Sequence, residues 1–344
     1  MKILKTAMLG FGNAGRAFAR ILLDKHDQLE KDYDVDVRLT AIVTGRHGTA
    51  IEPEGIDIQA ALELIESGGS FPSKDSALDV VQAADYDVVL ELTPLNIFTG
   101  QPAIFHLETA LSRGKHAITA NKGPIAWAYD RLSALARQQG VCFFCETTVM
   151  DGTPVFNLVE DTLKYCKILK VEGILNSTTN FVLEGLAAGT PYEDVLAEGR
   201  RRGFVEADPS MDIEGWDAAA KITAMLNVLM KAGITPMDVD RTGIEGVTAA
   251  DIVAAAARGC TIKLLCRGER REDGSVYASV KPTEVPSGSI WAGITGTSSV
   301  YSLTTDLMGK LTVVEHDPEL LQTGYGVFSD LVRVIDYNNK PSVS

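Results

Sequence analysis

The sequence contains no apolar run of the roughly 18 residues that a membrane-spanning helix needs. Its first nine residues lead directly into a glycine-rich motif, so we expect a strand there and not a secretory signal. Basic residues are also few: 32 Lys and Arg stand against 46 Asp and Glu, a formal net charge of -14. This balance argues against nucleic acid or an anionic membrane as the main partner. It leaves an anionic cofactor open, because a local pocket can oppose the field of the whole protein.

Cysteine is scarce and odd in number, with five residues at positions 142, 145, 166, 260 and 266. An odd count without an export signal is typical of a reducing compartment, so we expect a cytoplasmic protein. Cys142 and Cys145 have CxxC spacing, but no second pair follows, and residues three apart on a strand point to opposite faces. The favoured interpretation is small buried hydrophobic side chains, with a metal or redox role as the alternative.

The 344 residues predict two domains, and 45% hydrophobic with 23% charged residues is typical of a globular protein. The first half alternates between apolar strands and helices, which predicts a parallel sheet covered on both faces. Two charged segments, 24–36 and 45–75, are predicted to be a solvated loop and a surface insertion. The predicted strands are 6–9, 37–44, 87–92, 117–119 and 140–146, and the predicted helices are 14–23, 105–113 and 130–139.

The second half changes character near residues 146–154 and reads as a mixed α+β domain. Pro191 is predicted to be the first residue of a helix that ends at Arg202. The other predicted helices are 179–188, 217–232 and 327–334, and the predicted strands are 167–175, 261–267, 276–281, 300–305 and 311–314.

The segment Gly10-Phe11-Gly12-Asn13-Ala14-Gly15 is a GxGxxG motif between a predicted strand and a predicted helix. The first glycine permits a tight turn, the second lets the backbone approach a pyrophosphate, and the third lets helix and strand pack closely. The helix N-terminus then meets the phosphate charge. The motif in this context predicts dinucleotide binding.

The residues at the end of the second predicted strand indicate which dinucleotide, NAD or NADP, is bound. An NAD site usually has an acidic residue at its end, but Ala41-Ile42-Val43 continues into Thr44-Gly45-Arg46-His47 without a carboxylate. Arg46, with Thr44 and His47 beside it, is suited to a 2′-phosphate, which favours NADP over NAD. The alternative is that Arg46 is a solvated loop residue and that the specificity is mixed.

Two lysines are candidate catalytic residues. Lys122 follows a strand at the edge where parallel sheets place their ligands. Asp217 and Lys221 are four residues apart and therefore share one face of an otherwise apolar helix. A lysine held by a carboxylate near a pocket can move protons, and the nearby acids Glu206 and Asp212 suit an ammonium group. The alternative is that these charges are surface caps and salt bridges.

Together these motifs resemble homoserine dehydrogenase, in particular its short form without a C-terminal regulatory domain. The resemblance runs along nearly the whole chain and is most specific at 203–221; the other matching segments are 10–15, 91–94, 99–103, 114–124, 173–181 and 323–331. It implies a Rossmann-type doubly wound nucleotide-binding domain over residues 1–146, rejoined by 320–344. Residues 147–319 would then form the catalytic and dimerisation domain, with the site between the two.

The resemblance implies NAD(P)-linked interconversion of L-homoserine and L-aspartate 4-semialdehyde in threonine and methionine biosynthesis. It also implies a homodimer, and the short form predicts no threonine feedback through a regulatory domain. Lys221 would move the proton at the substrate oxygen, with Lys122 as a second candidate and Asp217 holding Lys221. Glu206, Asp212 and Thr178 would bind the substrate. The implied cofactor-binding residues are Gly10, Gly12, Asn13, Ala14, Gly15, Arg46, Thr93 and Lys122.

Three segments depart from the family pattern. In relatives the loop at 146–154 is richer in glycine and binds a monovalent cation; here the backbone oxygens of Glu146, Val149, Asp151 and Thr153 are the candidates. Ser177 stands where the family usually has glycine, and 316–322 replaces an expected glycine-rich loop. These departures leave two alternatives open: a dehydrogenase of a different amino or hydroxy acid, and a dinucleotide-binding protein without catalysis.

Overall fold

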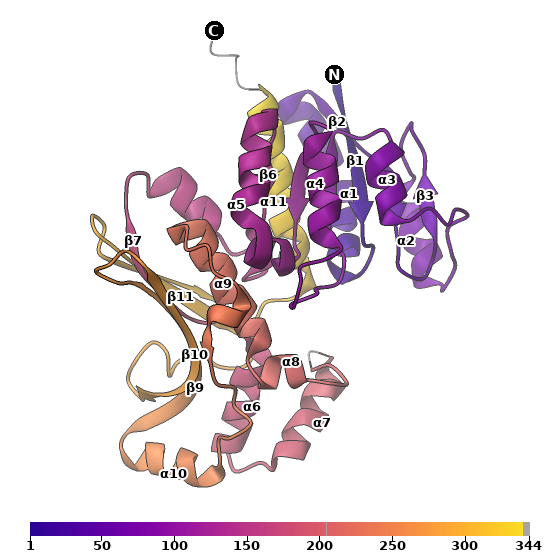
Figure 1. The fold of residues 1–344 in the computed structure, drawn as a ribbon. Coiled ribbons are helices and arrows are strands. Elements are labelled where there is room, and N and C mark those ends of the chain that lie inside the picture. Colours follow the sequence, from indigo (N-terminus) through magenta and orange to yellow (C-terminus); the bar gives the residue numbers. More distant parts are fainter. Residues whose placement is uncertain (204, 340–344) are drawn as a thin grey trace. The chain divides into compact units, whose positions relative to one another are not determined.

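The computed structural model describes residues 1–203 and 205–339, which form two compact units (Figure 1). Unit 1 comprises Met1–Val155 together with the chain from Glu319 onward, and unit 2 comprises Phe156–Pro318. Phe204, within the motif at 203–221, and residues 340–344, within the predicted rejoining segment, lie outside the described residues. Both ends of the described chain therefore belong to unit 1.

Unit 1 is built on a six-stranded sheet in the order β3-β2-β1-β4-β5-β6. All neighbouring strands are parallel except β3, which runs antiparallel to β2. The predicted parallel sheet and the doubly wound fold are confirmed. The strands are β1 (Lys2–Leu9), β2 (Val35–Val43), β3 (Thr49–Ile51), β4 (Val88–Glu91), β5 (His116–Thr119) and β6 (Phe143–Phe144).

Helices cover both faces of this sheet, and each face has its own hydrophobic core (Figure 1). Helices α1 (Asn13–Tyr33), α2 (Ile58–Glu66) and α11 (Leu320–Asn339) supply one core. Helices α3 (Ala77–Ala83), α4 (Ala103–Ser112) and α5 (Lys122–Gln139) supply the other. Strand side chains alternate between the two cores, as Met8 and Leu9 do, because successive side chains of a strand point to opposite faces.

Two predictions about the charged segments of the first half are wrong. Residues 24–33 continue α1, because Leu29 of this stretch is buried in the core and Lys25, Glu30 and Lys31 favour helix. Within 45–75 lie β3 and α2, whose first turn is capped by Asp57 and whose apolar side chains are buried. Charge content alone concealed the amphipathic pattern in both segments.

Unit 2 is built on a second six-stranded sheet in the order β12-β11-β7-β9-β10-β8. Its neighbours are antiparallel except for β8 with β10. The strands are β7 (Ile168–Ile174), β8 (Asp240–Arg241), β9 (Cys260–Arg270), β10 (Val276–Pro286), β11 (Ser299–Thr305) and β12 (Lys310–Glu315). The helices are α6 (Ser177–Ala187), α7 (Tyr192–Arg202), α8 (Ser210–Ile213), α9 (Trp216–Met230) and α10 (Ala249–Ala257).

Element boundaries differ from the predictions at several places. Pro191 is the N-cap of α7 and not its first residue. The predicted strand at 140–146 shrinks to β6, which a 3₁₀ turn at Glu146–Thr148 follows. The last helix is longer than predicted and begins at Leu320. Helices α3, α8 and α10 were not predicted, and two of them, α3 and α8, have fewer than eight residues, too few for a clear period.

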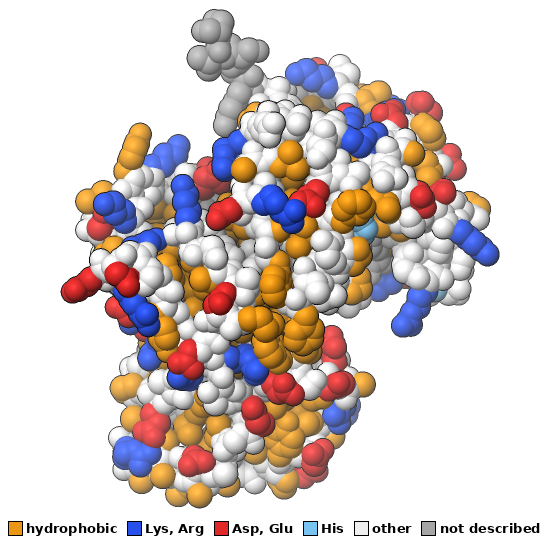
Figure 2. All heavy atoms as spheres, in the orientation of Figure 1, with side chains coloured by type: hydrophobic (Ala, Val, Ile, Leu, Met, Phe, Trp, Pro, Cys, Tyr) orange, Lys and Arg blue, Asp and Glu red, His pale blue; other side chains and the backbone are white. Residues whose placement is uncertain are grey.

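Acidic and basic side chains are interspersed over the face shown in Figure 2, although acidic residues outnumber basic ones. Local basic pockets are therefore compatible with the net charge of -14. Within the described residues, no helix combines the length and the hydropathy that crossing a membrane requires.

The closest helix contact of unit 1 joins α11 to α1 through Gly324. A β-carbon on Gly324 would lie 2.6 Å from the backbone of Ala17 and Phe18. We therefore expect Gly324→Ala to lower the free energy of unfolding by about 1–3 kcal/mol through overpacking, although alanine favours helix. Urea unfolding measures the change, with Tyr325→Ala at the neighbouring exposed position as the control. Equal stability of the two variants would contradict the close contact.

Candidate active site

The glycine motif forms the turn between β1 and α1. Gly10 has φ +103°, and a β-carbon there would lie 2.4 Å from the Leu92 carbonyl oxygen. A β-carbon on Gly15 would lie 2.5 Å from the Gly10 carbonyl oxygen, so this glycine sets the close helix–strand approach. Gly12 faces open space, since no atom lies within 4 Å of its ideal β-carbon. It precedes a helix start that no side chain caps, which fits a pyrophosphate.

A cavity of about 730 Å³ adjoins this turn and lies wholly in unit 1. Gly10, Thr44 and Arg46 line it, and Lys74, from the segment before α3, lines it as well. Two cationic side chains and one carboxylate, Asp75, therefore border one cavity at the carboxyl edge of the sheet. This volume and this charge fit the adenosine end of a dinucleotide.

Thr44 and His47, which we expected beside Arg46, serve mainly to hold the turn. The Thr44 hydroxyl donates to the Gly48 carbonyl oxygen at 2.8 Å and accepts from the His47 backbone N–H at 2.7 Å. His47 Nδ1 lies 2.8 Å from the Gly69 carbonyl oxygen. These bonds fix the backbone on both sides of Arg46 and leave the exposed guanidinium to face a ligand.

The remaining predicted residues of unit 1 follow strands β4 and β5. Thr93 lines the cavity two residues after β4 ends. Lys122 is the first residue of α5, and Asn121 before it caps the helix by accepting from the Gly123 N–H at 2.9 Å. Asn13 and Ala14 are the first two residues of α1, at the uncapped helix start. All of these positions lie at the carboxyl edge of the parallel strands, where such sheets bind ligands.

In unit 2, Lys221 is held in the interior turns of α9. Its ammonium donates to the Leu175 carbonyl oxygen at 2.7 Å and lies 3.0 Å from Asp217 Oδ2. The two side chains are only 17% and 16% exposed, so the pair is not a solvated surface salt bridge. The expected spacing of four residues thus places a paired lysine where its charge is partly shielded from water.

Asn176 connects this pair to Asp212. Its amide Nδ2 donates to Asp212 Oδ1 at 2.6 Å and to Asp217 Oδ2 at 3.0 Å. Its Oδ1 accepts from the Thr179 backbone N–H at 2.8 Å and caps α6. One buried carboxamide therefore fixes two carboxylates and the start of a helix.

Burial is the main cause that raises the pKa of Asp212 above its ordinary value, and the Asp217 carboxylate nearby raises it further. Hydrogen bonds from Asn176 and Thr178 act in the opposite direction, as does the charge of Lys221. The site thus keeps an acidic group in a place where a cationic ligand would favour its ionised form.

The other predicted substrate residues are placed unequally. Thr178 is buried in the first turn of α6 and donates to Asp212. Glu206 lies in an exposed stretch, and its backbone carbonyl accepts from Arg200. Within the described residues, the Glu206 side chain forms no hydrogen bond or ion pair with Asp212, Asp217 or Lys221.

The candidate cation loop is tied to α11. Glu146 is 2% exposed; its carboxylate accepts from the Val155 N–H, and its own N–H donates to Asp330 Oδ2 at 2.9 Å. Asp151, at φ +44°, accepts from the Thr323 hydroxyl at 2.5 Å. Thr153 donates its N–H to the Met150 carbonyl oxygen at 2.8 Å, and Val149 is buried. The loop that carries the candidate oxygens is therefore fixed.

The departures from the family pattern have defined places. Ser177 is the first residue of α6, directly after Asn176. Of the segment 316–322, residues 320–322 belong to α11, and Gln322 Oε1 accepts from the Glu319 N–H at 3.0 Å. A short turn and a helix start therefore stand where we expected the family's glycine-rich loop.

None of the five cysteines forms a disulfide, and three of them are buried: Cys142, Cys145 and Cys266. Burial raises the pKa of Cys266, which lies near Lys221, to about 12, so it stays a neutral thiol. The two cysteines of the CxxC spacing, Cys142 and Cys145, are buried in the same way as small hydrophobic residues.

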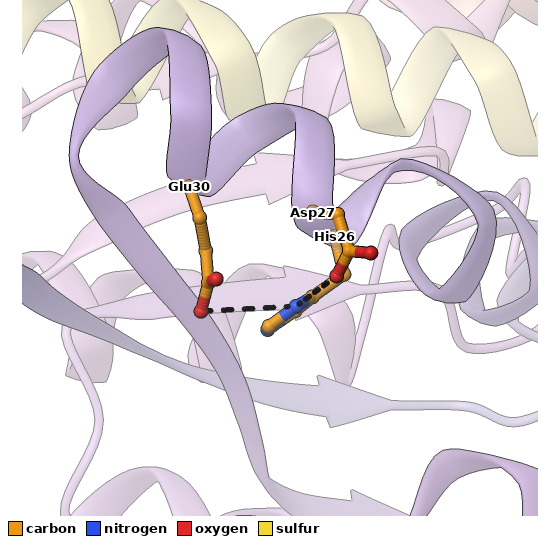
Figure 3. Close-up of side chains that lie close together, drawn as sticks. All are labelled: His26, Asp27 and Glu30. Carbon is orange, nitrogen blue, oxygen red and sulfur yellow. Dashed lines mark ion pairs between the residues drawn. The ribbon is translucent and has the colours of Figure 1, made fainter.

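The described residues contain one group with the spacing of metal ligands, His26, Asp27 and Glu30 on α1 (Figure 3). His26 Nδ1 lies 3.8 Å from Asp27 and 3.9 Å from Glu30, and its Nε2 lies 3.1 Å from Asp36 Oδ1. Asp27 is exposed. This arrangement is typical of surface ion pairs along a helix.

Sequence reasoning missed two residues of these sites. Asn176 belongs to a matching segment, but nothing in its spacing shows that its amide reaches two acids 36 and 41 residues away. Lys74 lies 28 positions after Arg46, in a stretch that we interpreted as a surface insertion. Its sequence neighbours, Ser73 and Asp75, gave no signal that this lysine borders a cavity.

Comparison with known proteins covers both units. The family model described as "Homoserine dehydrogenase" matches residues 154–332, and the one described as "Homoserine dehydrogenase, NAD binding domain" matches residues 10–146. A homoserine dehydrogenase from Methanocaldococcus jannaschii is 37% identical over 340 residues, which cover 97% of this chain and 99% of that protein. An NAD(+)-dependent homoserine dehydrogenase from Pseudomonas canavaninivorans is 32% identical and covers 96% of each chain. The crystal structure of a putative homoserine dehydrogenase from Archaeoglobus fulgidus has a TM-score of 0.87 and 32% identity, and the match covers 96% of this chain and 99% of that one.

The raised pKa of Asp212 predicts a pH-dependent stability. A carboxyl whose pKa is higher in the folded state favours folding at low pH, and this contribution is lost as pH rises through the raised pKa. Asp212→Asn should therefore raise the unfolding temperature, and by more at about pH 8 than at about pH 4. Thermal unfolding at both pH values measures the difference.

Asp208→Asn is the matched control, because a hydrogen bond from the Ser210 backbone lowers the pKa of Asp208. At pH values above the ordinary pKa of Asp, the ionised form of Asp208 stabilises the fold. Asp208→Asn should therefore not raise the unfolding temperature. A gain for Asp212→Asn that is equal at both pH values would contradict the assignment.

Proposed function

The chain belongs to the homoserine dehydrogenase family, and from this premise we propose that its two units divide the reaction between them. It is an oxidoreductase with a nicotinamide cofactor, and its substrate pair is L-homoserine and L-aspartate 4-semialdehyde. The observation that carries the catalytic assignment is the partly buried Lys221, held between the Asp217 carboxylate and the Leu175 carbonyl oxygen. A charged, oriented ammonium in such surroundings suits proton transfer at a carbinol oxygen.

Lys221 acts at the substrate oxygen. When bound, a nicotinamide dinucleotide supplies the carrier for the hydride that joins or leaves the substrate carbon. In oxidation, the neutral amine of Lys221 accepts the proton of the hydroxyl as the hydride leaves the carbon, and the resulting ammonium stays beside the carbonyl oxygen. In reduction, the same ammonium gives a proton to the oxygen. Asp217 keeps the lysine oriented, and Asn176 keeps Asp217 in place.

Asp212 binds the substrate's ammonium group in this proposal. Its partly buried carboxylate lies close to Asp217 and is held by Asn176 and Thr178. A cationic ligand would offset the unfavourable burial of this charge, which gives selectivity for amino acids over simple alcohols. Glu206, in an exposed stretch near α8, is the second acid assigned to the same group.

Lys122 of unit 1 is the second lysine that we assign to the reaction. Its place at the first turn of α5, at the carboxyl edge of the sheet, supports contact with the cofactor or the substrate oxygen. The glycine motif, Thr93 and the cavity beside them are assigned to the dinucleotide.

NADP is the preferred cofactor in our proposal. Arg46 and Lys74 line the cavity after β2, and no carboxylate ends this strand to hold ribose hydroxyls. Two cations suit the doubly charged 2′-phosphate that distinguishes NADP. The relative from Pseudomonas canavaninivorans is named NAD(+)-dependent, so both cofactors have to be tested.

We also propose a monovalent-cation site, a homodimer and a cytoplasmic location. The carbonyl oxygens of Glu146, Val149, Asp151 and Thr153 remain candidates for a monovalent cation, which the fixed loop around them supports. A homodimer and a cytoplasmic location follow from the family, and five cysteines without a disulfide suit a reducing compartment.

Lys221→Ala should lower kcat for L-homoserine oxidation by about 10²–10⁴-fold, because it removes the group that handles the proton. The Kd of NADP should stay unchanged, since the cofactor residues belong to unit 1. A spectrophotometric assay measures the first, and a binding titration measures the second. Lys281→Ala, on the surface of unit 2, is the control.

Near-normal turnover of Lys221→Ala would refute the catalytic assignment. If the unsubstituted protein binds the cofactor but oxidises another amino or hydroxy acid better than homoserine, the substrate assignment fails. If it oxidises none, the protein is a dinucleotide binder without catalysis.

The double substitution Arg46→Ser and Lys74→Ser should lower the kcat/KM ratio of NADP over NAD by about 10–100-fold. Each cation's hydrogen bond to a charged group contributes about 1.5–3 kcal/mol, and part of this is lost to solvent at exposed positions. The assay compares both cofactors at equal concentration, with the exposed Arg137→Ser of α5 as the control. An unchanged ratio would assign cofactor choice to other residues.

A further inference from the structure

Glu91 is a buried acid to which the reaction assigns no role. It is the last residue of β4, and none of its surface is exposed. Taking a carboxyl group out of water is costly unless hydrogen bonds or an opposite charge replace the water. The hydrogen-bond partners of the Glu91 carboxyl group therefore indicate its role in the fold.

The carboxyl group of Glu91 accepts hydrogen bonds from two segments at the sheet edge. The hydroxyl of Thr93 donates to Oε1, and the Thr93 backbone N–H lies 3.4 Å from the same oxygen. The Thr119 hydroxyl, from the end of β5, lies 3.3 Å from Oε2 and 3.0 Å from the Glu91 carbonyl oxygen. Every group that faces the carboxyl oxygens in these bonds is a donor.

The bonds continue from Thr119 to the start of α5 and return to Thr93. The Asn121 backbone N–H donates to the Thr119 hydroxyl at 3.0 Å. The Asn121 amide donates to the carbonyl oxygens of Thr93 and Pro94 at 3.0 and 3.3 Å. This closed network holds the turn after β4 against the helix start that carries Lys122.

The same turn supports the glycine motif. The backbone of Leu92 and Thr93 lies directly behind Gly10, where it leaves no room for a β-carbon. A shift of Thr93 would therefore move the wall against which the Gly10 turn packs. Three segments of the cofactor edge, around Gly10, Thr93 and Asn121, thus depend on one carboxyl group.

His106 of α4 completes the cluster. Its Nδ1 lies 3.6 Å from Glu91 Oε1 and is buried with no hydrogen-bond partner within the described residues. This distance is too long for a good hydrogen bond, so the ring packs against the carboxyl group without one. His106 also lines the cavity beside Gly10 and Thr93.

We propose that Glu91 is a positioning residue of the cofactor site, that His106 supports it by packing against its carboxyl group, and that the pair sets the cofactor affinity of unit 1. The carboxyl group holds the three turns in the arrangement that a dinucleotide needs. His106 lines the cavity and packs against Glu91, so it supports the carboxyl group on that side. This inference rests on the proposed function only in that the cofactor is a nicotinamide dinucleotide.

Glu91→Gln tests the inference with little change of shape. A glutamine replaces one acceptor oxygen by an N–H₂ group, so either the Thr93 N–H and hydroxyl or the Thr119 hydroxyl loses its acceptor, and that hydroxyl has to turn and accept instead. In the full-length protein, we expect the Kd of NADPH, measured by fluorescence titration, to rise about tenfold or more. The KM of the cofactor should rise in parallel, whereas the KM of L-homoserine should stay within about twofold, because unit 2 is unaltered. Glu108→Gln, on the same helix as His106 and paired with Arg131, is the matched control.

Two further variants cover the case in which Glu91→Gln does not fold. Thr119→Val removes one donor and keeps the shape, and it should raise the Kd of NADPH by a smaller factor. His106→Gln should raise it as well. If Glu91→Gln folds, the double variant Glu91→Gln/His106→Gln should bind no more weakly than Glu91→Gln alone, because the pair is already broken.

The outcomes separate this inference from the proposed function. A folded Glu91→Gln with the original Kd overturns the role of Glu91, while the proposed function stands. If Glu91→Gln does not fold, an unchanged Kd in Thr119→Val overturns that role. Additive losses in the double variant overturn the pairing with His106. If the unsubstituted protein binds neither NADPH nor NADH, both proposals fail together.

Discussion

The charge on Lys221 is the constraint on which the arrangement of unit 2 depends. Helix α9 is otherwise lined with buried Ala, Ile, Met and Leu side chains, so a cation in its middle needs compensation from outside the helix. Part of it comes from Asp217, one turn earlier, and part from two consecutive residues at the end of β7. Leu175 contributes its carbonyl oxygen, and Asn176 contributes the amide that fixes Asp217 and Asp212. One ammonium group therefore accounts for the arrangement of several elements. They are the end of β7, the starts of α6 and α9, and Asp212 near α8.

Both units hold their functional residues in place with the same local arrangement. In each, an asparagine two residues after a strand end caps the next helix with its side-chain oxygen and uses its side-chain N–H groups to hold functional residues. Asn121 caps α5 beside Lys122 and bonds to the turn at Thr93. Asn176 caps α6 and bonds to two carboxylates. A carboxamide suits this task because it accepts on one side, donates on the other and carries no charge of its own.

The sequence allowed the fold to be predicted where the period of the apolar residues is short and strong. The strands of unit 1 and the glycine turn belong to this class, as does the shared helix face of Asp217 and Lys221. Prediction failed where charge was taken as a sign of loop, at the second half of α1 and in the segment that holds β3 and α2. Contacts such as Asn176 with Asp212, or Thr119 with Glu91, could not be predicted from one sequence. They join residues far apart in the chain, and only the packed fold brings such side chains within hydrogen-bond distance.

Helix α11 is the last described element of the chain, yet its side chains Val327, Leu331 and Val334 complete the core that β1 and α1 begin. During synthesis, residues 1–155 emerge with one face of their sheet incompletely covered until residues 320–339 follow. At about 5–20 residues per second, this delay is on the order of 10–40 s. The nascent nucleotide-binding unit therefore remains an incompletely folded intermediate with exposed apolar surface throughout the synthesis of unit 2. Unit 1 can complete this core only after residues 320–339 have been synthesised.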